Sequence, residues 1–473
     1  MINDFFVKQI KKHFLYQFTS EQEQIVDILV NFLLSKDSEV AFLLKGYAGT
    51  GKTSIIGALV KVLDELKQKI VLLAPTGRAA KVFSHHAGHT AYTIHKKIYR
   101  QRVFSNGMDN FFLNDNLHKH TLFLVDEASM ISNNGCSGGG IFGSGCLLDD
   151  LVRYVYSGEG CRLLLIGDTA QLPPVSEDES PALSSLILEG YGLKVSECSL
   201  TQVVRQIDSS GILFNATRLR YKLTTEDFLD FPKFRLIGFS DICRMPGNEL
   251  IEALSTSYSH VGMDETMVIC RSNKRANLYN KGIRDTILYR EEELSSGDWL
   301  MIAKNNYHWT EDNKEVDFIA NGDIAVVRRV HRTREMYGFR FADVTISFPD
   351  YSDWELDATI LLDTLHSDYP ALSKEQNDRL FTTILEDYVD LPRKIDRMKK
   401  MKADSHYNAL QVKYAYAVTC HKAQGGQWKH IYLDQGYVTE EMLTPNYFKW
   451  LYTAITRATE KLYLVNWPKE QIE

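Results

Sequence analysis

The sequence predicts an α/β protein with two parallel-sheet cores, the first interrupted by a β-hairpin and the second by a small β-barrel. Two sets of short apolar runs support the two cores, one between residues 40 and 168 and the other between residues 266 and 466. Strands that are apolar along their whole length are typical of parallel sheets whose two faces are both covered by helices.

The first set of runs predicts the strands of the first core. These strands are expected at 40–45 (VAFLLK), 69–75 (KIVLLAP), 121–127 (TLFLVDE) and 162–168 (RLLLIGD). Residues 53–66, TSIIGALVKVLDEL, have the spacing of a helix and follow the first strand. Ligands of such sheets bind at the carboxyl ends of the strands, so we expect the site of this core there.

Two segments interrupt the first core. Residues 98–115 form two β-prone runs around Asn106 and Gly107, and this pair is a strong signal for a hairpin turn. Residues 133–146, NNGCSGGGIFGSGC, contain too many glycines for a regular element and are expected to form a loop.

The second set of runs predicts strands at 266–271 (TMVICR), 414–420 (YAYAVTC), 430–434 (HIYLD) and 461–466 (KLYLVN). Residues 311–350 alternate and turn like short antiparallel strands, and residues 373–402 have a helical pattern with a break at Pro392. The resulting division is a first core at 1–175 with a hairpin insertion at 96–118, a second core at 176–310 and 407–473, and an inserted barrel with a helical segment at 311–406.

The composition excludes several classes of protein. A chain of 473 residues suggests about three domains. Its net charge of −7 does not fit a protein that coats nucleic acid, so any nucleic acid is expected in a local groove. No stretch approaches the ~18 apolar residues of a membrane span, and no secretory signal precedes the first core. With seven scattered cysteines and no Cys-x-x-Cys pair, we expect a cytoplasmic protein with no membrane partner.

A nucleotide site is predicted after the first strand. The segment GYAGTGKT fits the pattern G-x-x-x-x-G-K-[ST] and lies between a predicted strand and a predicted helix. Backbone N–H groups of such a turn can surround a β-phosphate, Lys52 supplies charge to the β- and γ-phosphates, and Thr53 supplies a hydroxyl to Mg²⁺. ATP and Mg²⁺ are therefore the expected cofactors; the alternative is a glycine-rich turn that binds nothing. The candidate ATP contacts are Gly46, Ala48, Gly49, Thr50, Gly51, Lys52, Thr53 and Ser54.

Polar residues follow two further strands of this core. In LFLVDEAS, Asp126 could hold Mg²⁺ and Glu127 could orient an attacking water, although acidic residues at this place can also cap the next helix. In IGDTAQLPPV, Gln171 offers a donor and an acceptor that could sense the γ-phosphate. The alternative for the second segment is a turn stiffened by its two prolines.

Two arginines are candidates for the transition state of phosphoryl transfer. Arg205 lies in LTQVVRQ, and Arg457 lies in YTAITRATEKLYL, just before a predicted strand. An arginine on a helix is usually a surface residue, but an arginine supplied by a neighbouring core can accelerate hydrolysis by roughly 10³–10⁵. If both reach the γ-phosphate from the second core, hydrolysis would open and close the interface between the cores.

The motifs GYAGTGKT, APTGRAA, LVDEAS, GDTAQLPPV, LTQVVRQ, AVTCHKAQGGQW and YTAITRA occur in this order, and the set resembles that of the superfamily 1 helicases, in particular superfamily 1B with its RecD-like branch. The resemblance covers residues 15–300 and 407–470. It implies two RecA-like cores, an inserted SH3-like β-barrel and an ATP-dependent DNA helicase.

The resemblance also implies contacts that the residues alone do not reveal. Gln22, in FTSEQEQ, would contact adenine, while Gln424 and Gly425 would lie close to the nucleotide. The sequence has Gln427 where the family usually has glutamate, so a ribose contact at this position stays open. Single-stranded DNA would lie against Pro75, Thr76, Arg78, His95, Thr419, His421 and Lys422. For His95 the alternative is a packed structural residue.

The hairpin at 98–115 resembles the pin with which members of this family split a duplex. Phe104, Phe111 and Phe112 are candidates to stack on the last base pair. Stacking of a base on an aromatic ring contributes ~1–3 kcal/mol, which is comparable to the ~1.4 kcal/mol of one base-pair step. Alternatively, these rings form the small core of the hairpin itself.

The sequence as a whole predicts an ATP-dependent helicase that moves on single-stranded DNA and opens duplex junctions in replication, repair or recombination. The resemblance to the RecD-like branch implies that it moves 5′→3′. A monomer is expected, with replication or repair proteins as possible partners. Two alternatives stay open: an RNA helicase of the same superfamily, and an ATP-gated clamp that holds nucleic acid without unwinding it.

Overall fold

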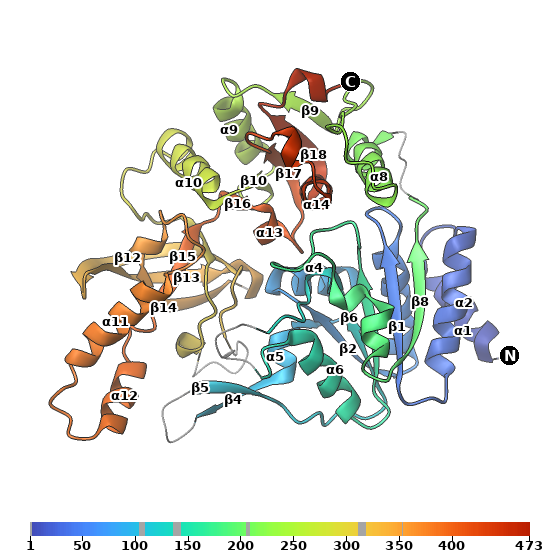
Figure 1. Ribbon diagram of the computed structural model, residues 1–473, viewed down its shortest axis with the longest axis horizontal. Coiled ribbons are helices and arrows are strands. Elements are labelled where there is room, and N and C mark those ends of the chain that lie inside the picture. The colour runs from blue at the N-terminus through green and yellow to red at the C-terminus, as the bar shows by residue number, and fades with distance from the viewer. Residues whose placement is uncertain (1, 104–108, 136–142, 205–208, 311–317, 352) are drawn as a thin grey trace.

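The computed structural model describes residues 2–103, 109–135, 143–204, 209–310, 318–351 and 353–473, and it contains two parallel sheets, a closed barrel and a two-stranded ribbon (Figure 1). In the view of Figure 1 the first core lies at the lower right, the second core above it and the barrel at the left. The predicted fold class, with two α/β cores, a hairpin and a barrel, is confirmed.

The first sheet has the strand order β3-β2-β6-β7-β1-β8, and all of its strand pairs are parallel. Its strands are β1 (Val40–Gly46), β2 (Lys69–Ala74), β3 (Ala91–Thr93), β6 (Thr121–Val125), β7 (Arg162–Gly167) and β8 (Lys194–Leu200). Because β8 pairs with β1 from Val40 to Gly46, the first core extends to Leu200 and not to residue 175 as the sequence suggested.

Both faces of this sheet are covered, as its apolar strands predict. Phe42 and Leu44 of β1 pack in one cluster, while Ala41 and Leu43 pack in another on the opposite face. This alternation follows from the two-residue period of a strand. The helices of this core are α1 (Ile2–His13), α2 (Ser20–Leu34), α3 (Lys52–Glu65), α4 (Gly77–Ala87), α5 (Ile94–Ile98), α6 (Leu147–Ser157) and α7 (Ser185–Glu189).

The second sheet has the strand order β16-β10-β17-β18-β9 and is also parallel throughout. Its strands are β9 (Ile242–Met245), β10 (Thr266–Cys270), β16 (Ala417–Thr419), β17 (Trp428–Asp434) and β18 (Ala458–Val465). Its helices are α8 (Gly211–Thr224), α9 (Leu250–His260), α10 (Asn273–Gly282), α13 (Cys420–Ala423) and α14 (Pro445–Ile455).

The barrel includes more of the chain than the predicted insertion at 311–406. Its strands are β11 (Trp299–Ile302), β12 (Ile324–Met336), β13 (Phe339–Phe348), β14 (Trp354–Leu361) and β15 (Leu410–Tyr414). The first and last of these lie outside the predicted bounds, because β11 pairs with both β12 and β15 and so closes the barrel. The helical segment forms α11 (Lys374–Glu386) and α12 (Lys394–Lys402), on either side of the expected break.

The hairpin of the first core consists of β4 (Tyr99–Val103) and β5 (Asp109–Leu113), which pair in antiparallel fashion with Tyr99 opposite Leu113. Its predicted turn at Asn106 and Gly107 lies outside the described residues, as do residues 136–142 of the glycine-rich segment at 133–146. Among the helices that the structure describes, none has the length and apolar character needed to cross a bilayer.

Candidate functional site

The phosphate loop connects β1 to α3, as the sequence predicted. Gly49 and Gly51 have φ angles of 78° and 87°, a left-handed conformation that glycine adopts without strain. A side chain on Gly51 would also place its Cβ 2.7 Å from Nε2 of Gln22. Because α3 begins at Lys52, directly after these glycines, its first N–H groups lie at the loop, where they could bind a phosphate.

Lys52 lies inside the curve of this loop. Its Nζ donates hydrogen bonds to the carbonyl oxygens of Gly46, at 2.5 Å, and of Tyr47, at 2.9 Å. The amine is thereby held where the loop and the start of α3 converge.

Gln22 is buried beside the loop, with 1% of its surface exposed. Its Nε2 donates to the carbonyl oxygen of Thr50 at 3.0 Å, and its Oε1 accepts from the backbone N–H of Thr19 at 3.1 Å. The second bond belongs to a capping box that begins α2. The side chain therefore fixes the start of α2 against the phosphate loop, a role that the sequence did not reveal.

Two neighbouring carboxylates follow β6. Asp126 accepts a hydrogen bond from the backbone N–H of Glu127 at 2.9 Å, and burial, together with the adjacent charge of Glu127, raises the pKa of Asp126 above its usual range. Glu127 has a φ angle of 51°, which is uncommon for a residue with a side chain and concentrates at functional sites.

The donor set at this place fits Mg²⁺. Thr53 offers a hydroxyl and Asp126 a carboxylate, and Mg²⁺ prefers such oxygen ligands. A divalent ion would offset the negative charge that raises the pKa of Asp126. In the part of the chain that the structure describes, no group of three or more His, Cys, Asp or Glu side chains could hold a metal. Phosphate oxygens and water would complete the shell of Mg²⁺, as they usually do for this ion.

The segment after β7 brings Gln171 into the same interior. Gln171 is 7% exposed, and its Oε1 has no hydrogen-bond partner among the described residues. Leaving such a group unpaired costs about 1–3 kcal/mol. Nearby, Asp168 is 1% exposed, and burial raises its pKa although the charge of Lys52 opposes that rise. A buried polar group without a partner, close to a charged loop, indicates a place for a ligand.

Arg457 of the second core reaches the carboxylates of the first. It is 3% exposed, and its Nη1 lies 3.7 Å from Oε1 of Glu127. Its Nε donates to the carbonyl oxygen of Thr453 at 3.1 Å, and its Nη1 donates to that of Gly426 at 3.3 Å. These bonds orient the guanidinium toward the first core. The other predicted arginine, Arg205, lies outside the described residues.

Other residues of the second core hold the segment that contains Gln171. Nε2 of Gln424 donates to the carbonyl oxygen of Leu172 at 2.8 Å, and the N–H of Leu172 donates to Oγ1 of Thr453 at 2.8 Å. Gly425 has a φ angle of 74°, and a side chain there would place its Cβ 2.9 Å from Cβ of Ala79 in the first core. The two cores thus meet at the predicted nucleotide site.

The candidate DNA contacts of the first core also lie near this interface. Thr76 caps α4 by accepting a hydrogen bond from the N–H of Ala79 at 3.2 Å. The guanidinium of Arg78 lies 4.1 Å from the centre of the Trp428 ring and donates to the carbonyl oxygen of Gln427 at 3.2 Å. Arg78 therefore bridges the cores, and burial lowers its pKa.

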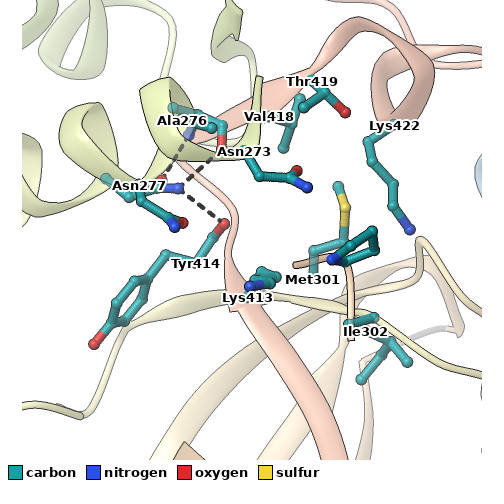
Figure 2. A pocket seen from close by; sticks show the side chains of 14 residues that line it. Asn273, Ala276, Asn277, Met301, Ile302, Lys413, Tyr414, Val418, Thr419 and Lys422 are labelled. Atoms are coloured by element: carbon teal, nitrogen blue, oxygen red, sulfur yellow. Dashed lines mark hydrogen bonds between the residues drawn. The ribbon is translucent and has the colours of Figure 1, made fainter. Parts of the chain in front are cut away.

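The candidate DNA contacts of the second core lie beside the barrel. Thr419 and Lys422 line a pocket formed by α10, the end of β16, and the barrel (Figure 2). Lys413 of β15 lines the same pocket, and burial lowers the pKa of both lysines to about 8. Lys422 donates a hydrogen bond to Asn321, in the turn before β12, and His421 is exposed on α13. Lys413 is a basic residue of this region that the motifs did not identify.

His95 lies on α5, directly before the hairpin strand β4. Burial lowers its pKa to about 4, and its ring lies 5.7 Å from that of Tyr99. The role of His95 as a DNA contact stays a prediction.

The structure separates the three phenylalanines of the hairpin. Phe111 is 8% exposed and its ring lies 4.2 Å from that of Tyr307, so it packs beneath the hairpin and the proposed stacking role is wrong for this residue. Phe112, the next residue along β5, faces the opposite side of the ribbon and is half-buried. Phe104 lies outside the described residues. Phe112 is thus the described ring that retains the stacking prediction.

Comparison with known proteins agrees with this arrangement. A family model described as an AAA domain matches residues 17–226, and one described as a UvrD-like helicase C-terminal domain matches residues 414–465. The ATP-dependent RecD2 DNA helicase of Deinococcus radiodurans is 30% identical over 201 residues, and the ATP-dependent DNA helicase Dda of Enterobacteria phage T4 is 24% identical over 298 residues. The chain is thus similar in sequence to ATP-dependent DNA helicases, including RecD2 and Dda.

The chain matches these relatives over different shares of their lengths. It is 24% identical to an uncharacterised protein of Acanthamoeba polyphaga mimivirus, over 94% of this chain and 99% of that protein. The match with RecD2 covers 41% of this chain and 23% of the relative, and the match with Dda covers 60% and 61%. The chain thus spans less than two thirds of either RecD2 or Dda. A Pif1 helicase from Bacteroides in complex with ADP-AlF3 and ssDNA superposes with a TM-score of 0.49 and 16% identity, covering 97% of this chain and 95% of that one.

Proposed function

We propose that this helicase hydrolyses ATP between its two cores, moves 5′→3′ along single-stranded DNA, and opens duplex DNA at a junction. The observation that supports this most strongly is the position of Arg457, a buried arginine of the second core 3.7 Å from Glu127 of the first. Because Arg457 and Glu127 belong to different cores, the rate of ATP hydrolysis would depend on the relative position of the cores.

In this proposal each side chain has one task. Lys52 binds the β- and γ-phosphates, and Glu127 orients the attacking water. Gln171 contacts the γ-phosphate through the carboxamide whose oxygen is otherwise unpaired, and Arg457 stabilises the charge of the transition state. Thr53 and Asp126 would hold Mg²⁺, which neutralises charge on the phosphates. The remaining loop residues and Gln22, Gln424 and Gly425 would complete the nucleotide site.

Movement would follow from changes at the interface of the cores. Thr76 and Arg78 belong to the first core, while Thr419 and Lys422 belong to the second. If hydrolysis separates Arg457 from Glu127, the distance between these two groups of DNA contacts changes as well. Alternate release of the strand by each group then advances the protein. We propose that it acts as a monomer in replication, repair or recombination.

Strand displacement from forked DNA tests the proposal. We expect release of the displaced strand from forks with a 5′ tail, and not from forks with only a 3′ tail, in the presence of ATP and Mg²⁺. Lys52→Ala should abolish both ATP hydrolysis and strand release while leaving the circular dichroism spectrum unchanged, because it removes the charge that binds the phosphates.

Three results would contradict the proposal. Release from the 3′-tailed fork alone would reverse the direction of movement. ATP turnover without strand release on either fork would indicate a clamp. Release only when the tracking strand is RNA would indicate an RNA helicase.

A further inference from the structure

We propose that Tyr452 is a positioning residue for ATP hydrolysis. Its single hydroxyl connects the phosphate loop of the first core to the Gln171 segment, residues 168–172, of the same core. The proposal rests on the function proposed above and names one more residue of the same site. Tyr452 lies on α14 of the second core, so it would make the turnover rate depend on how the cores are docked.

The hydroxyl of Tyr452 makes two hydrogen bonds across the interface. It accepts from the backbone N–H of Ala48, in the phosphate loop, at 2.8 Å. It donates to Oδ2 of Asp168, at the end of β7, at 2.6 Å. Ala48 and Asp168 come from different loops of the first core, and the described contacts join both of them to this one atom of the second core.

Both hydrogen bonds of the Tyr452 hydroxyl lie in the protein interior, where losing one is costly. Tyr452 and Asp168 are each 1% exposed, so water does not replace a lost bond at little cost. The other oxygen of Asp168 accepts from the N–H of Ala170 at 2.9 Å, so among the described residues the Tyr452 hydroxyl is the side-chain donor to this carboxylate. A short bond from a hydroxyl to a buried carboxylate belongs to the stronger class of hydrogen bonds.

The second core fixes the Gln171 segment at both of its ends. Tyr452 holds Asp168 at one end, and at the other Leu172 is bound through its N–H by Thr453 and through its carbonyl by Gln424, each at 2.8 Å. Gln171, with its unpaired oxygen, lies between these two points. Tyr452 does not itself approach the reacting atoms. Its effect on hydrolysis would pass through the placement of the phosphate loop and of Gln171.

Tyr452→Phe tests this role, because phenylalanine fills the same space and removes only the hydroxyl. We expect the kcat of DNA-stimulated ATP hydrolysis to fall about 10- to 100-fold, the range that follows from losing a hydrogen bond to a charged group. We expect KM for ATP to stay within about threefold, because Lys52 and the start of α3 are untouched. Tyr432→Phe is the matched control: Tyr432 is a buried tyrosine of the same core whose hydroxyl bonds Ser257 at 2.7 Å, away from the nucleotide site.

A double-mutant cycle with Asp168→Asn separates positioning from general packing. If the Tyr452–Asp168 bond carries the effect, the double variant loses no more kcat than the more impaired single variant. The proposal is overturned if Tyr452→Phe keeps the wild-type kcat, if Tyr432→Phe lowers kcat equally, or if the two losses simply add. An inactive wild-type protein would instead refute the proposed function, so the two failures are distinguishable. Thermal melting of each variant confirms that it is folded.

Discussion

Glu127 and Arg457 approach to 3.7 Å although they belong to different cores, and both are largely removed from water. In such a place a charge interacts more strongly with its surroundings than it would at the surface. The same holds for Tyr452 and Asp168, whose contact is a hydrogen bond in place of an ion pair. At the scale of single residues, the site therefore depends on polar side chains of the second core buried against the first.

Replacing Arg457 by alanine should spare ATP binding and impair hydrolysis. An arginine that stabilises the transition state from a neighbouring core contributes roughly 10³-fold or more to kcat, so we expect a loss of that order. Arg457→Lys should recover little, since a lysine cannot reproduce the bonds to both Thr453 and Gly426. The measurement is single-turnover hydrolysis, with nucleotide affinity determined separately by fluorescence.

The control for this prediction is Arg218→Ala, which removes a surface arginine of the same core that pairs with Glu473. Its hydrolysis rate should match that of the wild type. An unchanged rate in Arg457→Ala would show that the second core does not act on the phosphates.

At the scale of elements, one side of the hairpin β4–β5 packs against the rest of the molecule. Phe111 packs against Tyr307, in the segment between β11 and β12, and Tyr307 in turn packs against Phe318 with a ring separation of 5.2 Å. Since residues alternate along a strand, Phe112 lies on the opposite side of the ribbon from this contact. The same strand thus combines a structural ring with a ring that is a candidate for DNA.

The adjacent pair Phe111 and Phe112 gives matched variants for the function of the hairpin. Phe112→Ala should lower the rate of strand separation severalfold and leave DNA-stimulated ATP hydrolysis nearly unchanged, because it removes a stacking ring worth ~1–3 kcal/mol. Phe111→Ala should instead destabilise the protein by about 3–5 kcal/mol, as buried phenylalanines do. Unwinding assays and thermal melts distinguish the two. Equal loss of unwinding and hydrolysis in Phe112→Ala would point to a structural role for this ring as well.

At the scale of the whole molecule, the barrel is joined to both cores. Lys81 of α4 pairs with Asp350 at 2.8 Å, and a side chain on Gly77 would place its Cβ 2.6 Å from Oδ1 of Asp323 in the turn before β12. On the other side, Lys422 of the second core bonds Asn321 in the same turn. The net charge of −7 is thus compatible with a local basic site, because Lys413 and Lys422 lie together where the barrel meets the second core (Figure 2).

The affinity for single-stranded DNA should fall as the pH rises through about 8. Burial lowers the pKa of Lys413 and of Lys422 to about 8, so both amines are largely protonated at pH 7 and largely neutral at pH 9. Neutral amines do not attract phosphates, and the dissociation constant should therefore increase between these pH values at constant salt. Fluorescence anisotropy with a labelled oligonucleotide measures this change.

Replacing both lysines by glutamine should weaken binding at pH 7 and remove most of the pH dependence. The corresponding control is Lys119→Gln, since Lys119 is exposed on the first core and pairs with Glu159 at 2.6 Å. If the double variant keeps the pH dependence of the wild type, other groups are responsible for it.

The sequence by itself determined the α/β class, the phosphate loop and the order of the motifs. Each of these depends on a contiguous pattern: an apolar strand, glycines that permit a tight turn, and a helix that begins at Lys52. Only the tertiary structure decided that Phe111 is buried, that β11 and β15 close the barrel, and that Tyr452 bonds Ala48, from which it is separated by 404 positions. Such contacts join residues far apart in the chain, and the local periodicity of the sequence carries no information about which distant side chains will meet.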